Sequence, residues 1–421
     1  MGVGRVHSWK IKEYSHFGML LVVQALALIS EGILRFALPL YLLNASGSPS
    51  LYGVVTAVAF VPSVLLMPFG GVVADRVDMR RILAIAGLVL ILCGVCYLFL
   101  FTTRLLLVTV LFLMALYAVH ALYAPMFQAQ IPRMLDAAHV KRGVSLVNQV
   151  STASNVVGPV VAGVLMGWMG IAPLVSFGMA CLAAVVALAC VRSSPMRFPT
   201  ASADARAGDS AIAGREGLFR DMRTGILFLR DEKSLLLSIV FACLVNAVLA
   251  GANVILPYVI TEQLAWNAAA VGSAEAVGAV GALAGSAFVG LAPGFCTMRR
   301  FSAFVALLGF GPLISVAGSF FGFNAAVQFV CLAAGVAWIL FWGSVTTVVL
   351  VSDIQLHCGS DMVGRVLALF FAAATCASPI GQAACGVAID MCGAAALLVF
   401  MATAMELFAV LIALLSRRYA D

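Results

Sequence analysis

The sequence predicts an all-α polytopic membrane protein with twelve transmembrane helices in two pseudo-symmetric six-helix bundles. Three observations support this fold class: the composition, the spacing of the apolar runs and an internal repeat. Of the 421 residues, 63% are hydrophobic and only 10% are charged, whereas soluble globular proteins carry about 25% charged residues. A surface that faces lipid instead of water accounts for this deficit of charge.

Hydropathy divides the chain into twelve apolar segments, each close to the length of about 20 residues that crosses a bilayer. They lie at residues 17–43, 50–74, 82–103, 105–130, 143–167, 172–191, 235–260, 267–290, 301–321, 324–350, 363–386 and 393–416. The longest polar stretch follows the sixth segment. We therefore expect an N-terminal bundle (1–191), a cytoplasmic central loop (192–234) and a C-terminal bundle (235–421). Within the loop, an apolar stripe over 217–233 predicts an amphipathic helix on the membrane surface.

The basic residues predict the orientation of the chain. Twenty-two of the 24 Lys and Arg residues fall in the termini or in loops on one side, whereas Arg104 falls on the other side and Arg35 lies within a span. The positive-inside rule places both termini in the cytoplasm. The net charge of +6 then reflects topology, and we expect the lipid bilayer as a partner and no nucleic acid. Short loops and an odd number of cysteines fit the inner membrane of a bacterium.

An internal repeat relates the two halves at an offset of about 219 residues. The pairs are Gly32 with Gly251, Pro39 with Pro257, Gly71 with Gly290, Arg80 with Arg299, Arg81 with Arg300, and Pro159 with Pro379. Parallel six-helix repeats, related by an axis along the membrane normal, are typical of one class of secondary transporter.

A short charged hinge joins the second and third apolar segments. It reads Gly71-Val-Val-Ala-Asp75-Arg76-Val-Asp78-Met-Arg80-Arg81. A basic turn this short indicates the cytoplasmic side, and a helix N-terminus would favour an anion such as Asp75. The basic end of the hinge is duplicated in the second half, but Asp75 corresponds to Gly294.

The hinge resembles the signature Gly-x-x-x-Asp-Arg-x-Gly-Arg-Arg of the major facilitator superfamily, and Asp78 stands where that family has glycine. The resemblance covers essentially the full chain. It implies that Asp75 meets the start of the eleventh span and that this cluster breaks in each transport cycle. The alternative is a charge cluster that only fixes orientation. The expected gating residues are Gly71, Asp75, Arg76, Arg80, Arg81, Gly364 and Arg365.

The fifth span carries Gly158-Pro159 and Gly163, which resembles a Gly-Pro-x-x-Gly-Gly element of exporters in the superfamily, with Val164 at the last position. Glycine and proline also allow plain close helix packing, as Pro379 would in the second half. Local phrases such as Phe36-Ala-Leu-Pro-Leu-Tyr41 resemble a drug-export branch that contains macrolide-efflux and siderophore-export proteins.

Charged residues inside a membrane are costly and mark functional candidates. Glu31 and Arg35 lie four residues apart on one face of the first span. They form either a structural pair or a cavity site in which Glu31 accepts a proton. His120 in the fourth span is the second proton-coupling candidate, with a packed neutral histidine as the alternative. Glu275, in the outer half of the eighth span, could admit cations, whereas Glu406 in the twelfth span is expected to lie away from the cavity.

Spans 1, 4, 7 and 10 line the central cavity in the superfamily. By this resemblance, and because aromatic faces suit flat or cationic organic molecules, the candidate substrate contacts are Gln24, Tyr123, Asn246, Asn253, Trp338, Phe341 and Trp342. For the aromatic residues of span 10 the alternative is core packing, and for the amides it is hydrogen bonding between helices.

The sequence therefore predicts a secondary transporter, not an enzyme, that exports amphipathic organic molecules in exchange for protons or another coupling ion. The chain has no phosphate-binding Gly-x-x-x-x-Gly-Lys-Ser/Thr loop and no metal triad, so we expect neither ATP-driven pumping nor a cofactor. We expect it to act as a monomer. The alternatives are an importer of a small nutrient or metabolite and a non-transporting membrane receptor on the same scaffold.

Overall fold

The computed structural model describes residues 3–76, 78–135, 140–190, 233–357 and 360–418, and no strand occurs in these ranges. Side chains at 3–16, 67–76 and 361–365 lie outside the description. The predicted amphipathic helix at 217–233 and the rest of the central loop fall almost wholly on residues that are not described.

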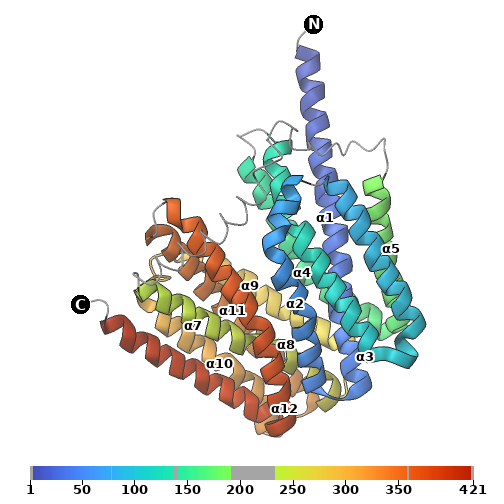
Figure 1. The fold of residues 1–421 in the computed structure, drawn as a ribbon. Helices are drawn as coiled ribbons and strands as arrows, with labels where there is room; N and C mark the ends of the chain where they lie inside the picture. Colours follow the sequence, from blue (N-terminus) through green and yellow to red (C-terminus); the bar gives the residue numbers. More distant parts are fainter. Residues whose placement is uncertain (1–2, 77, 136–139, 191–232, 358–359, 419–421) are drawn as a thin grey trace. The chain divides into compact units, whose positions relative to one another are not determined.

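The helices follow the predicted apolar segments (Figure 1). Before the central loop they are α1 (Val3–Ser46), α2 (Pro49–Arg76), α3 (Met79–Met134), α4 (Val140–Met169) and α5 (Ile171–Cys190). After it they are α7 (Lys233–Ala250), α8 (Ala252–Tyr258), the π-helix η1 (Val259–Gln263), α9 (Ala268–Leu291), the 3-10 turn η2 (Met298–Arg300), α10 (Phe301–Phe320), α11 (Ala325–His357) and α12 (Ser360–Arg418).

Ten helical stretches of the described chain are long and apolar enough to cross a membrane. Two of them, Met79–Ala124 and Leu369–Leu415, have 46 and 47 residues, or roughly 70 Å at 1.5 Å per residue, about twice the thickness of a bilayer core. Each is interrupted once. Arg104 (φ −136°, ψ 39°) breaks α3, and Gly393 (φ 81°, ψ 160°) breaks α12 in a conformation that only glycine adopts readily. Each long helix is thus a pair, in keeping with twelve spans.

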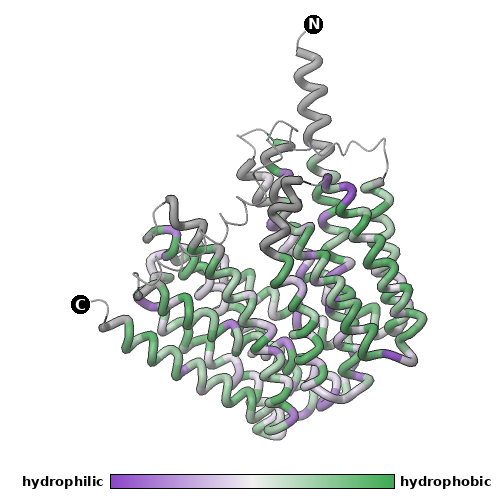
Figure 2. The backbone as a smooth tube through the Cα atoms, in the orientation of Figure 1, coloured by the Kyte–Doolittle hydropathy of each residue, from purple (hydrophilic) through white to green (hydrophobic). Residues whose placement is uncertain are grey.

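Many large apolar side chains of the described residues face outward, as lipid requires. Phe99 is 79% exposed, Trp168 81% and Leu291 86%. Figure 2 shows hydrophobic residues running along the full length of most helices. The outward apolar surface identifies a multi-pass membrane protein, because a water-facing surface would carry polar residues at these positions.

The chain forms two compact units. The first is drawn from Met1–Leu42 and Val58–Ser210, and the second from Leu43–Ala57 and Ala211–Asp421. In the first, α3 packs on α4 and α5. In the second, α11 packs on α9 and α10, and α12 packs on α7, α8 and α10.

The beginning of α2 belongs to the second unit through a close backbone contact with α12. A methyl group on Gly53 would lie 2.5 Å from the carbonyl oxygen of Gln382 and 3.2 Å from Cα of Gly386. The amide of Ser50 donates to Oδ2 of Asp390 over 3.2 Å. Glycine at positions 53 and 386 lets α2 and α12 touch without side chains between them.

Candidate functional site

A buried ionic cluster lies in the first unit, around the carboxylate of Glu31. This side chain is only 1% exposed. Its Oε2 forms an ion pair with Nη2 of Arg35 at 3.1 Å and a hydrogen bond with Nδ1 of His120 at 2.9 Å. Arg35 also donates to the carbonyl of Leu116 and lies over the ring of Tyr117, 4.4 Å from its centroid. The carboxylate is therefore neutralised by Arg35 and touched by a titratable ring.

The contact between Glu31 and His120 joins residues 89 positions apart. The predicted pair of Glu31 and Arg35 was expected from their helical spacing, but no sequence signal placed His120 beside them. His120 is 31% exposed, and its Nε2 has no hydrogen-bond partner within the described part of the chain. Of Glu31 and His120, His120 is thus the more exposed side chain.

Glycines set the position of Glu31 by bringing α1 against α4. A methyl group on Gly158 would lie 2.9 Å from Cα of Gly32, the residue next to Glu31. Pro159 lies inside α4 directly after this contact, and Gly163 is buried one turn further on. Ser30 donates to the carbonyl of Gly178 over 2.8 Å. Gly158 therefore lies at a close backbone contact between α1 and α4.

A cavity of about 360 Å³ opens beside the cluster, lined by residues of α1, α2, α3 and α4. Three of the predicted site residues line it: Gln24, His120 and Tyr123. Gln24 donates from Nε2 to the carbonyl of Val147 and to Oγ of Ser151, which is the interhelical role expected of amides. The ring of Tyr123 meets His120 edge-on, with centroids 5.6 Å apart.

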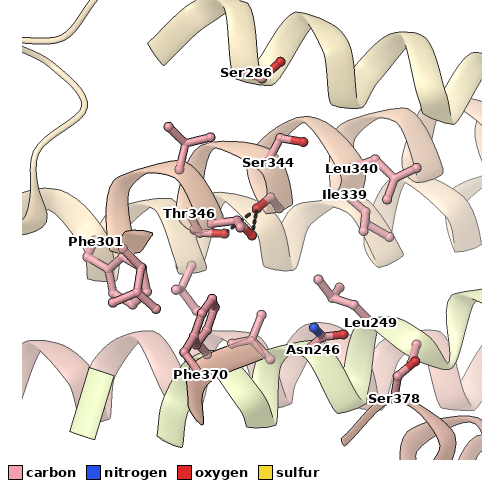
Figure 3. A pocket seen from close by; sticks show the side chains of 18 of the residues that line it. Asn246, Leu249, Ser286, Phe301, Ile339, Leu340, Ser344, Thr346, Phe370 and Ser378 are labelled. Carbon is pink, nitrogen blue, oxygen red and sulfur yellow. Dashed lines mark hydrogen bonds between the residues drawn. The ribbon is translucent and has the colours of Figure 1, made fainter. Parts of the chain in front are cut away.

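A second cavity of about 390 Å³ lies within the second unit, and Asn246 and Asn253 are among the residues that line it. Figure 3 shows Asn246 on α7 facing Ser344 and Thr346 of α11, with Phe370 and Ser378 of α12 completing the wall. All polar groups in this lining are amides or hydroxyls, and none of the lining side chains is charged. The cavity therefore offers hydrogen bonds on an apolar wall.

The seventh span changes its hydrogen-bond pattern at Gly251 beside this cavity, while the backbone there stays helical (φ −61°, ψ −28°). α7 ends at Ala250 and α8 begins at Ala252, so Gly251 separates Asn246 from Asn253. Gly251 corresponds to Gly32 in the internal repeat, and each glycine lies in close contact with a neighbouring helix. A side chain on Gly251 would collide with Cys385. Pro257 inside α8 cannot donate a helix bond, and η1 follows it.

The three aromatic candidates of α11 do not belong to the lining of the described cavity. The indole of Trp338 donates to the carbonyl of Leu307 on α10 over 2.6 Å. Trp342, 8% exposed, stacks on Phe304 with centroids 5.7 Å apart, and Phe341 packs against Trp342 and Phe288. These contacts favour the core-packing alternative over substrate contact. Pro379 lies inside α12, two residues before Gly381, which approaches the backbone of Ala247 too closely for a side chain.

The charged hinge begins the third span with a helix cap. Asp78 adopts an extended conformation, and its Oδ1 accepts from the amide of Arg80 at 3.0 Å. Asp78 therefore caps α3, a role that its place before an apolar run could have indicated. Arg81 is exposed. The surroundings of Gly71 and Gly364 and the side chains of Asp75, Arg76 and Arg365 lie outside the description, so the predicted gating contact stays a prediction.

A family model described as Major Facilitator Superfamily matches residues 20–382. The chain belongs to this superfamily. Two sequences named macrolide efflux protein A are similar to it, one from Streptococcus pyogenes and one from the serotype M6 strain of that species. Each is 24% identical over 382 residues, which cover 90% of this chain and 89% of the relative.

Solved superfamily transporters share the fold. A mutant of the nucleoside transporter NupG is 14% identical with a TM-score of 0.72, covering 94% of this chain and 98% of its own. A POT family transporter in complex with a thioalcohol-conjugated peptide is 12% identical with a TM-score of 0.70, covering 96% of each chain. A bacterial homologue of the human lysosomal transporter Spinster is 15% identical with a TM-score of 0.66, covering 96% and 95%. The superfamily protein described here is thus a membrane transporter of small molecules and not an enzyme.

Proposed function

We propose that this transporter exports amphipathic organic molecules from the cytoplasm in exchange for protons. The observation that carries the proposal is the contact between buried Glu31 and half-exposed His120 at the edge of a cavity. Export is supported by the similarity over 90% of the chain to sequences named macrolide efflux protein A. Both termini would lie in the cytoplasm, in the inner membrane of a bacterium, and the chain would act as a monomer.

The charges of the cluster give a physical route to exchange. The charges of Glu31 and Arg35 sum to zero. The cluster is therefore neutral when His120 is neutral, and it carries a charge of +1 when His120 is protonated. Inside a membrane protein such a charge acts over several ångströms because the surroundings are poorly polarisable. A proton on His120 therefore disfavours a positively charged molecule in the adjoining cavity, and that molecule disfavours the proton. Mutually exclusive occupancy is the condition for exchange.

Alternating access would come from two halves that rock about a site near the midplane. In this proposal residues 1–191 and 235–421 are the halves, and residues 192–234 link them. The hinge at Gly71–Arg81 would close the cytoplasmic side through Asp75 and the start of the eleventh span at Gly364 and Arg365.

The test uses the purified protein in vesicles with an imposed pH gradient and a panel of fluorescent amphipathic amines and macrolides. We expect wild-type protein to move substrate against its gradient when protons flow the other way. Glu31→Gln and His120→Asn should abolish gradient-driven transport. Both should keep downhill exchange of substrate, because Gln and Asn remove a titratable group and leave a polar side chain in its place.

Glu406→Gln is the matched control, because Glu406 is another carboxylate in a span but lies against Gly309 of α10, away from both described cavities. It should transport like the wild type. If a compound moved in the same direction as the protons, the result would support nutrient import over export. If no compound of the panel moved, the result would support a non-transporting receptor. Unchanged coupling in both Glu31→Gln and His120→Asn would refute the assignment of the proton site.

A further inference from the structure

Arg104 stands at a corner of the chain, away from the ionic cluster of Glu31. It breaks α3 into two arms, with φ −136° and ψ 39°, and its side chain is exposed. Within the described part of the chain, its guanidinium has no ion pair, hydrogen bond or ring contact. A guanidinium has five donors and stays charged, so this one can take an anion from outside the protein.

Aromatic packing holds the corner in place. On the first arm the ring of Tyr97 stacks on Phe101 with centroids 5.9 Å apart, and it meets Phe112 of the second arm at 6.0 Å. Tyr97 and Phe112 are 0% and 1% exposed. The ring of Tyr41 on α1 lies 6.4 Å from that of Phe101. Arg104 therefore extends from a fixed support.

A groove of about 430 Å³ lies at this corner. It is lined by Thr103, Arg104, Leu105, Leu106, Leu107 and Val110. Leu106 is 46% exposed and Leu107 56%, and Leu111, one turn after Leu107, is 54% exposed. A single charged group thus stands at the end of a row of exposed apolar side chains, which complements an amphiphile with an anionic head.

The corner lies at the depth of lipid headgroups. It separates the apolar segments at 82–103 and 105–130, so it comes where one span ends and the next begins. On the predicted topology this is the outer surface, and Arg104 is the only Lys or Arg in the outer loops. Basic residues orient a chain from the cytoplasmic side, so topology gives no reason for an arginine here.

A lipid accounts for the groove better than a soluble anion or a transported molecule. A soluble anion would neutralise Arg104 and leave the exposed leucines uncovered. A transported molecule would pass through the described cavities, and none of the groove residues lines either of them.

We propose that this groove binds an anionic phospholipid of the outer leaflet. The phosphate accepts charge-assisted hydrogen bonds from Arg104, and an acyl chain lies along Leu106, Leu107 and Leu111. The hydroxyl of Thr103 donates to the carbonyl of Leu100 over 3.3 Å, so Arg104 is the group that selects the head. The bound lipid holds the corner between the third and fourth spans at the membrane surface. Such a lipid site is independent of what the protein transports.

The test is native mass spectrometry of the purified protein in detergent, titrated with dioleoyl phosphatidylglycerol. Dioleoyl phosphatidylcholine, which has the same chains and a phosphate but no net charge, is the comparison lipid. We expect the wild type to retain phosphatidylglycerol in preference to phosphatidylcholine. Arg104→Gln should weaken retention of phosphatidylglycerol about fivefold or more, because a basic residue near the membrane surface is lost, and should leave phosphatidylcholine unchanged. Arg104→Lys should keep part of the preference, since it keeps the charge but not the fork of donors.

Arg299→Gln is the matched control, because Arg299 is an exposed arginine on the opposite predicted side, and it should retain both lipids like the wild type. Inorganic phosphate in excess over the lipid should not displace phosphatidylglycerol. The proposal is overturned if the wild type shows no preference for phosphatidylglycerol, if Arg104→Gln keeps that preference, if Arg299→Gln loses it to the same extent, or if phosphate alone displaces the lipid. A thermal unfolding curve of each variant in lipid-free detergent separates loss of the groove from loss of the fold. Because neither a gradient nor a substrate is used, failure here is distinct from failure of proton-coupled export.

Discussion

The buried pair of Glu31 and Arg35 predicts a specific pattern of stability in a double-mutant cycle. Arg35→Leu leaves the carboxylate, 1% exposed, with His120 as its remaining partner. Removing one member of a buried ion pair typically costs about 3–5 kcal/mol. Because Arg35 is 20% exposed, we expect the lower end, about 3 kcal/mol. Glu31→Gln keeps a hydrogen-bond acceptor and should cost less, about 1–3 kcal/mol.

The double variant removes the charge imbalance as well as the pair. It should therefore be less destabilised than the sum of the single variants, by about 1–2 kcal/mol, within the range measured for residues in contact. The assay is reversible unfolding of the purified protein in mixed micelles, followed by tryptophan fluorescence. A control cycle pairs Arg35→Leu with Glu406→Gln, whose effects should add. Additivity within about 0.5 kcal/mol for Glu31 and Arg35 would refute the view that they stabilise each other.

Three further predictions concern close contacts and a helix cap. Gly158→Val should destabilise the protein by about 1–3 kcal/mol, because the added atoms meet backbone that cannot move aside; Gly18→Val, with nothing within 4 Å of its Cβ, should be tolerated in the same unfolding assay. Gly53→Val should lower the thermal midpoint in detergent for the same reason, and Gly290→Val, also in open space, should not; equal shifts for the two would contradict the contact. Asp78→Ala should cost about 1 kcal/mol through loss of the cap of α3, and Asp78→Asn, which keeps the acceptor oxygen, should restore most of that stability in urea or detergent titrations.

Much of the fold could be predicted from the sequence because its determinants are local. The apolar runs have the length that a bilayer requires, and the predicted boundaries at 103–105 and 386–393 bracket or meet the breaks at Arg104 and Gly393. The repeat pairs such as Gly32 with Gly251 also emerge as close helix contacts. The cavity residues Gln24, Asn246 and Asn253 follow from the superfamily resemblance, since a shared fold exposes the same spans to the interior.

The aromatic residues of α11 show the limit of such reasoning. Trp338, Phe341 and Trp342 suit a ligand cavity by composition. In the structure Phe341 and Trp342 pack against rings of α9 and α10, and the indole of Trp338 donates to a carbonyl of α10. Whether an aromatic ring faces a cavity or a neighbouring helix depends on the rotation of α11 against helices distant in sequence. Asp78 is a second example. In the motif alone it is only a departure from the family pattern, whereas in the folded chain it caps the N-terminus of α3.

By itself the sequence determined the class of molecule, the spans and their breaks, and the helical pair of Glu31 and Arg35, because hydrophobic length, charge placement and i to i+4 spacing are properties of short stretches. Only the tertiary structure decided that His120 is the third member of the cluster and that Gly158 brings α4 into backbone contact with α1. These facts depend on which helix faces meet, and that is decided by side chains far apart along the chain.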